Sequence, residues 1–160
     1  MRIRILLIAG GAVAVAVGLL ATSLFQIKAE KRDMLACTTE LIFTRNAGKA
    51  SEVRVNVITQ FYFHRDGTGI TTYKGAASSQ GQAMMVDRDV NFTWKPRSDA
   101  GIIELTYTKT VRRHNDNTPG NVWGDFAQSG ARYYLTIAEV APSVWLIQDR
   151  KYPTYLCREE

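Results

Sequence analysis

The sequence predicts a mainly β protein, in which one transmembrane helix precedes an antiparallel meander of strands that curls into a barrel or half-barrel. Two observations support this prediction. Residues 5–25 form an apolar run without a charge. From about residue 37 onward, apolar and polar residues alternate with a period of two between turn-forming segments. A β-sandwich built from the same strands is the alternative.

The apolar run is long enough to cross a bilayer. As a helix rising ~1.5 Å per residue, residues 5–25 would extend about 31 Å, against a hydrocarbon layer of ~30 Å. Arg2, Arg4 and the small residues 21–23 would also suit a cleavable signal peptide, but the apolar run continues to Ile27, beyond an ordinary signal core. We therefore expect an uncleaved anchor with its N-terminus in the cytoplasm.

The expected organisation has four parts. Residues 1–4 form a cytoplasmic N-terminus, 5–25 the transmembrane helix, 26–36 a juxtamembrane linker and 37–160 an exported β domain. Of the net charge of +5, the residues up to 33 hold +3, next to the predicted span. Basic residues at this depth suit anionic lipid headgroups, so we expect no direct contact with nucleic acid.

Two cysteines, Cys37 and Cys157, lie at opposite ends of the predicted β domain. In an oxidising compartment they can form a disulfide. Closing a loop of about 120 residues would restrict the unfolded chain by ~4–5 kcal/mol in the loop-entropy model. Two separate buried thiols are the alternative, and we expect the disulfide.

Seven segments have the periodicity or composition of strands. Turn residues lie at 46–49, 65–69 and 96–101, and a loop is expected at 78–82. The tail, 151–157, is expected to be extended. The predicted strands are residues 37–45, 52–64, 70–77, 85–95, 102–113, 131–140 and 143–149.

Residues 114–130 interrupt this rhythm. They are polar and rich in Gly and Asn, yet they contain Trp123 and Phe126. We expect a long loop or one short helical turn whose aromatic side chains pack against the barrel. If the meander did not close, its edge strands would leave backbone groups that another chain could bind.

Six aromatic residues lie on the apolar faces of the predicted strands. They form the barrel core, or some of them line a lipocalin-like pocket for an apolar or amphipathic small molecule. Arg88 and Lys109 alternate in phase with inward residues, where a basic side chain could meet a ligand carboxylate or sulfonate, or mark a wet rim. The six aromatic residues are Phe61, Phe63, Phe92, Trp94, Tyr107 and Tyr133.

The sequence offers no recognisable catalytic or metal-binding set. His64 and His114 are the only histidines, and His64 with the nearby Asp66 does not complete a metal site. No Gly-x-Ser-x-Gly motif occurs. Asp87 and Asp89 lie on the polar face of one strand, where we expect them to be solvated. We therefore expect neither enzymatic activity nor a cofactor.

The segment YLTIAEVAPSVWLIQDRKYPTYLC, from Tyr134 to Cys157, resembles the FidL-like family of small inner-membrane proteins. The turn Asp66–Gly69 after a Phe-Tyr-Phe strand also looks like that family, as does the layout of one span and an exported β domain. The resemblance implies a single-pass protein of the bacterial inner membrane, with a cytoplasmic N-terminus and a barrel-like periplasmic domain.

Proteins of this kind look like the ToxS and VtrC type, which accompany a membrane-bound, ToxR-like transcription regulator. The resemblance therefore implies a heterodimer with such a regulator and a role in signal transduction that controls virulence. It also implies that a small amphipath such as a bile salt binds in the joint barrel. A stand-alone, lipocalin-like binding module is the alternative.

Overall fold

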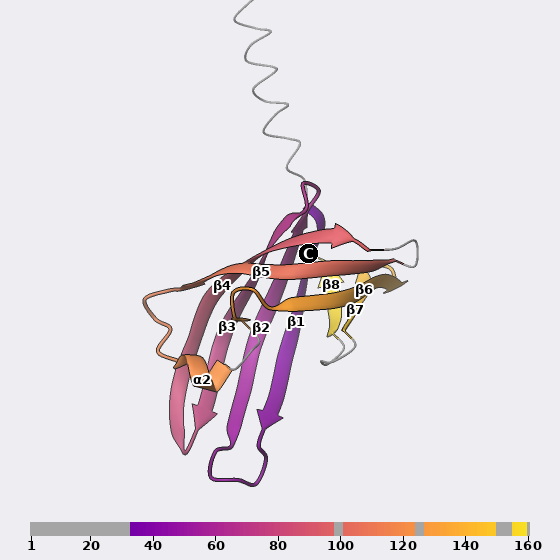
Figure 1. Ribbon diagram of the computed structural model, residues 1–160. Coiled ribbons are helices and arrows are strands. Elements are labelled where there is room, and N and C mark those ends of the chain that lie inside the picture. Colours follow the sequence, from indigo (N-terminus) through magenta and orange to yellow (C-terminus); the bar gives the residue numbers. More distant parts are fainter. Residues whose placement is uncertain (1–32, 98–100, 124–126, 150–154, 160) are drawn as a thin grey trace, which may run out of the picture. The chain divides into compact units, whose positions relative to one another are not determined.

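The computed structural model describes residues 33–97, 101–123, 127–149 and 155–159 (Figure 1). Its strands follow one another around a closed antiparallel barrel, in which each strand is hydrogen-bonded to the next in sequence and the last returns to the first. The elements are β1 (Asp33–Arg45), β2 (Val53–His64), β3 (Thr68–Ser79), β4 (Gln82–Pro96), β5 (Ile102–Arg112), α2 (Gly120–Trp123), β6 (Arg132–Ala141), β7 (Val144–Asp149) and β8 (Tyr155–Glu159).

The alternation of apolar and polar residues places the core inside the barrel. In β2, Val53, Val55 and Val57 are buried, whereas Arg54 and Asn56 between them are exposed. Successive side chains of a strand point to opposite faces, so a run with a period of two buries one face only. The seven predicted strands correspond in order to β1–β7, which confirms the antiparallel meander.

The two ends of the barrel extend further than predicted. β1 begins at Asp33, inside the predicted linker 26–36, because Leu35 is buried in phase with the rest of that strand. Of the tail that was predicted to be extended at 151–157, residues 151–154 lie outside the described residues, and the eighth strand, β8, begins at Tyr155 and continues to Glu159. Its contact with β1 closes the barrel.

The connection between β3 and β4 is also tighter than the loop expected at 78–82. It consists of Gln80 and Gly81, whose φ angles are 52° and 77°. Positive φ at both central residues suits the right-handed twist of the adjoining strands. Gln80 is an uncommon residue for this position, so the sequence carried no signal for the tight turn.

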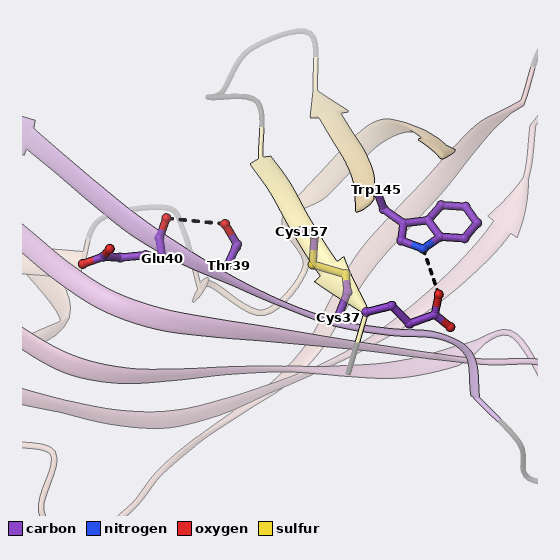
Figure 2. The surroundings of a disulfide bond; sticks show 6 residues. Cys37, Thr39, Glu40, Trp145 and Cys157 are labelled. Carbon is purple, nitrogen blue, oxygen red and sulfur yellow. Dashed lines mark hydrogen bonds between the residues drawn. A yellow bond between two sulfur atoms is a disulfide. The ribbon is translucent and has the colours of Figure 1, made fainter. Parts of the chain in front are cut away.

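The closed strand order rules out both the half-barrel and the sandwich. The pairing that closes it is short, with Cys37 opposite Glu159 and Thr38 opposite Arg158. The predicted disulfide joins these two strands and is confirmed: the Cα atoms of Cys37 and Cys157 lie 5.4 Å apart (Figure 2). Beside it, the indole N–H of Trp145 donates to the Glu159 carboxylate at 3.2 Å.

A β-bulge in β5 reverses the alternation halfway along the strand. Asn91 pairs with Lys109 and Phe92 pairs with Tyr107, so Thr108 is an extra residue on β5. Tyr107 is buried, but Lys109 is exposed. The prediction that Lys109 points inward is therefore wrong, because one extra residue shifts the alternation by one position.

The segment between β5 and β6 contains the short helical turn expected within 114–130. In this turn, α2, Val122 is buried and its carbonyl accepts a hydrogen bond of 3.1 Å from the Arg45 guanidinium of β1. The side chains of Trp123 and Phe126, expected to pack on the barrel, lie outside the described part of the chain.

Within the described residues, none of the helices has the length and apolar character needed to cross a bilayer. The predicted anchor at 5–25 and the predicted cytoplasmic residues 1–4 lie outside the residues that the structure describes.

Candidate functional site

Aromatic rings fill one end of the barrel interior. Phe63 is fully buried, and its ring centroid lies 5.0 Å from that of Phe92 and 6.2 Å from that of Trp94. The Trp94 indole N–H donates to the backbone carbonyls of His64 and Thr68, both at 3.1 Å. These hydrogen bonds attach β4 to the turn between β2 and β3. The rings of Phe63, Phe92 and Trp94 therefore form part of the packed core.

Phe92 also depends on a glycine. In the register, Phe92 lies opposite Gly69 of β3, and a Cβ on Gly69 would come within 2.2 Å of the Phe92 ring. The same Cβ would lie 2.5 Å from the carbonyl oxygen of Tyr62. Only glycine leaves room for an aromatic ring to lie across the strand at this position.

Tyrosines form a second cluster further along the interior. The hydroxyls of Tyr73 and Tyr107 are 3.1 Å apart, and the rings of Tyr107 and Tyr133 are 4.9 Å apart. Burial raises the pKa of Tyr73 well above its ordinary value, and burial also raises the pKa of Tyr107 and of Tyr155. These phenols are therefore neutral at neutral pH and act as hydrogen-bonding groups inside an apolar wall.

A small cavity lies among these tyrosines. Its volume is about 30 Å³, roughly the share of liquid volume that one water molecule occupies. This cavity is therefore large enough for ordered water but far too small for an amphipathic ligand. The cavity is lined by Phe61, Tyr73, Leu105, Tyr107, Tyr133, Leu135, Ile147, Asp149 and Tyr155.

Arg88, predicted to point inward, is buried and forms an ion pair that the sequence did not reveal. Its Nε and Nη2 donate to the Asp116 carboxylate at 2.6 and 2.7 Å. Burial alone would raise the pKa of Asp116, but hydrogen bonds from Arg88 and from the amides of Thr118 and Asp87 hold that pKa below its ordinary value. Arg88 is thus already paired with a carboxylate of the same chain.

The six predicted aromatic residues are gathered on the inner side of the barrel, with Trp94 only partly buried. They divide between the phenylalanine-rich end and the tyrosine cluster. Arg88 joins the interior from β4, whereas Lys109 stands on the outer surface of β5. Asp116 is the residue that sequence reasoning missed, because it lies 28 residues from Arg88 in a loop with no periodic signal.

A hollow of about 410 Å³ lies on the outer side of β2–β4, next to Arg113, which follows β5. On one of its sides the guanidinium of Arg113 reaches both carboxylates that were expected to be solvated, 2.8 Å from Asp89 and 3.6 Å from Asp87. The side chains that line the hollow include acidic and basic residues and one isoleucine. It is lined by Ile58, Gln60, Thr72, Tyr73, Lys74, Asp87, Asp89 and Arg113.

The described residues contain no group of three or more His, Cys, Asp or Glu side chains that could hold a metal ion. His64 is partly buried at the end of β2, and His114 is exposed in the loop after β5. The chemistry of the described part thus consists of one buried ion pair, buried phenols, a disulfide and the outer hollow.

No curated protein matches the chain significantly. The family described as FidL-like putative membrane protein matches residues 75–157, slightly more than half of the chain. The match runs from β3 into β8 and includes Arg88, Asp116 and the segment from Tyr134 to Cys157 that carries the resemblance. The barrel described above is thus the fold of this matched region together with β1 and β2, and the chain belongs to the FidL-like putative membrane protein family.

Proposed function

We propose that this protein is anchored in the bacterial inner membrane by residues 5–25 and acts as the periplasmic accessory partner of a ToxR-like membrane-bound transcription regulator. Three features support the proposal: membership of a family described as membrane proteins, an apolar segment at residues 5–25, and a disulfide that needs an oxidising compartment. Together they favour a single-pass protein with its barrel in the periplasm.

The observation that carries the proposal is the small size of the cavity among the tyrosines inside the barrel. Pockets for small molecules usually measure ~300–1,000 Å³, whereas the cavity among the tyrosines measures about 30 Å³. A bile salt does not fit into that space unless side chains move. Among the described residues the cavity inside the barrel is thus small, whereas the hollow of about 410 Å³ lies on the outer side, so the outer surface is favoured as the site that recognises another protein.

Barrel closure also bears on how a partner would bind. An open meander would have presented edge strands, but the described strands close from β8 back to β1. We therefore expect the regulator to pack against a face of the barrel, and a joint ligand site, if formed, to lie between the two proteins.

The test is co-purification of the regulator with the tagged full-length chain from membranes that contain both proteins. The matched control is a tagged chain of residues 1–36, which keeps the predicted span and lacks most of the barrel. Recovery of the regulator with the full chain alone is the expected result. Equal recovery with both chains, or with neither, would contradict the proposal.

A ligand-binding module is the second candidate, and the barrel fold is compatible with it. It is favoured by the phenols of Tyr73, Tyr107 and Tyr155 around the cavity, because hydroxyls in an apolar wall can orient an amphipath. The test is calorimetric titration of the full chain in nanodiscs with a bile salt. Saturable binding that Tyr133→Trp abolishes by filling the cavity would favour this role, whereas partitioning without saturation would exclude it.

A further inference from the structure

We propose that the outer face of β1–β3 is the interface of a homodimer, in which a second copy of this chain packs about a two-fold axis that runs along β2. This inference is independent of the proposed function. The three strands are long neighbours in the sheet (Figure 1). We call this surface the β1–β3 face, defined by Glu40, Ile42, Asn56, Ile58, Lys74 and Ala76.

The β1–β3 face exposes apolar side chains. Ile42 is 66 % exposed and Ile58 is 47 % exposed, on adjacent strands. Ile42 lies opposite Asn56, so Ile58 is its diagonal neighbour on the same face, at about 7–8 Å. Ala76 of β3 lies on the other side of Asn56 and continues the apolar strip. Ile42, Ile58 and Ala76 thus form a small exposed apolar cluster around Asn56, of the kind that interaction surfaces contain.

The β1–β3 face also carries one acidic and one basic side chain. Glu40 of β1 and Lys74 of β3 both lie directly opposite Ile58, one on each side. Both side chains are exposed, and within the described part of the chain neither forms an ion pair. The neighbouring carboxylates of Asp87 and Asp89 face Arg113. Lys74 lies directly opposite Asp87 of β4, and the Asp87 carboxylate is 3.6 Å from Arg113. Each copy therefore offers one anion, Glu40, and one cation, Lys74, at equal distances from β2 and outside the ion pairs of the described residues.

These positions suit a second copy of the chain. A two-fold axis along β2 and in the plane of the contact exchanges β1 with β3. Glu40 of each copy then faces Lys74 of the other, Ile42 faces Ala76, and Ile58 faces its own counterpart. This is the self-complementarity that an isologous interface requires, in a face-to-face sheet packing of ordinary type.

The first experiment measures the dimer dissociation constant of the fluorescently labelled full chain in detergent micelles. Glu40→Lys and Lys74→Glu each place like charges opposite one another twice per dimer, so each should raise the constant about tenfold or more. The double variant restores opposite charges and should return to within about threefold of the wild type. Lys109→Glu, a charge reversal on the exposed side of β5, is the matched control and should change nothing.

The second experiment needs no disruptive variant. Residue 58 lies on the proposed axis, so mild oxidation of the Ile58→Cys variant in membranes should produce a disulfide-linked dimer of the chain. A reducing agent should cleave this dimer to monomers. Lys109→Cys, away from the axis, should give none. A monomer at all concentrations, charge reversals that behave like Lys109→Glu, or an Ile58→Cys cross-link to a different protein would each overturn the proposal.

Discussion

The guanidinium of Arg88 in β4 holds the carboxylate of Asp116 in the following loop through two hydrogen bonds of 2.6 and 2.7 Å. The two side chains are 4 % and 0 % exposed. The Asp116 carboxylate also accepts the amide hydrogens of Asp87 and Thr118. The pair therefore joins the barrel wall to the segment after β5 where water cannot replace either partner.

Arg88→Met should destabilise the protein by about 3 kcal/mol, because the buried Asp116 carboxylate loses its two shortest hydrogen bonds and keeps only the half-exposed Arg112, at 3.4 Å, as a cation. Denaturant unfolding of the full chain in micelles measures this. The double variant, Arg88→Met with Asp116→Leu, should lose less free energy of unfolding than the two single variants lose in sum, because the two residues interact directly. Additive losses would show that the two side chains act independently.

The contribution of this pair should disappear in acid. The pKa of Asp116 lies below its ordinary value of 3.8, so the stabilisation is complete above that value and is lost as the pH falls through the folded-state pKa. The difference in unfolding free energy between wild type and Asp116→Asn should be constant near neutral pH and narrow below about pH 4. Thr136→Ala, which changes an exposed uncharged residue on β6, should show no such narrowing.

Replacing both cysteines by serine should cost about 2–5 kcal/mol, because the disulfide restricts a loop with a sequence separation of 120. Unfolding curves with and without reducing agent give the same comparison for the wild type. The two-pair junction of β1 and β8 should then lose hydrogen-exchange protection before the β2–β3 ladder does. Identical unfolding of oxidised and reduced protein would contradict this prediction.

Gly69→Ala should destabilise by about 1–3 kcal/mol, because the new methyl would overlap the Phe92 ring and the Tyr62 carbonyl. Thermal unfolding measures the loss. Gly120→Ala is the matched control, since a Cβ at that position meets nothing within 4 Å, and it should be neutral. Equal effects at the two positions would mean that the Phe92 ring moves aside without cost.

Stability should fall at alkaline pH. The pKa values of Tyr73 and Tyr107 are raised above their ordinary value of 10.0 by burial. The contribution of these neutral phenols is therefore complete below pH ~10 and is lost as the pH rises toward the folded-state values. Urea unfolding between pH 8 and 11 should show this slope, with Tyr73→Phe reducing it. A slope that Tyr73→Phe leaves unchanged would contradict this prediction.

Much of the barrel could be predicted because its signal is local. The alternation in β2 needs only neighbouring residues to show which face is buried, and Gly67 marks the turn to β3 with a φ of 80°. The two cysteines at the domain ends suggested their pairing from position alone. Closure of the barrel needed the short strand at Tyr155–Glu159, which has too few residues for a periodic pattern.

The features that escaped prediction depend on contacts between distant residues. Thr108 looks like any strand residue, and only its register against β4 shows that it is the extra one. Asp116 lies in a polar loop, and nothing nearby in the sequence indicates that Arg88 will meet it. The outer hollow likewise arises from the arrangement of three strands and of Arg113 after β5. The alternation of apolar and polar residues predicted which face of each strand is buried. It could not locate a β-bulge, where an extra residue interrupts the pairing of two strands.

The junction between β1 and β8 has a consequence for biosynthesis. The strand that completes the ring, Tyr155–Glu159, and the thiol of Cys157 come from the far end of the domain. The barrel cannot close until the ribosome has synthesised this end. Before then the nascent domain is an open sheet, and Cys37 cannot yet form its disulfide with Cys157. A premature stop codon before Cys157 would release a chain that lacks both the last strand and the cross-link.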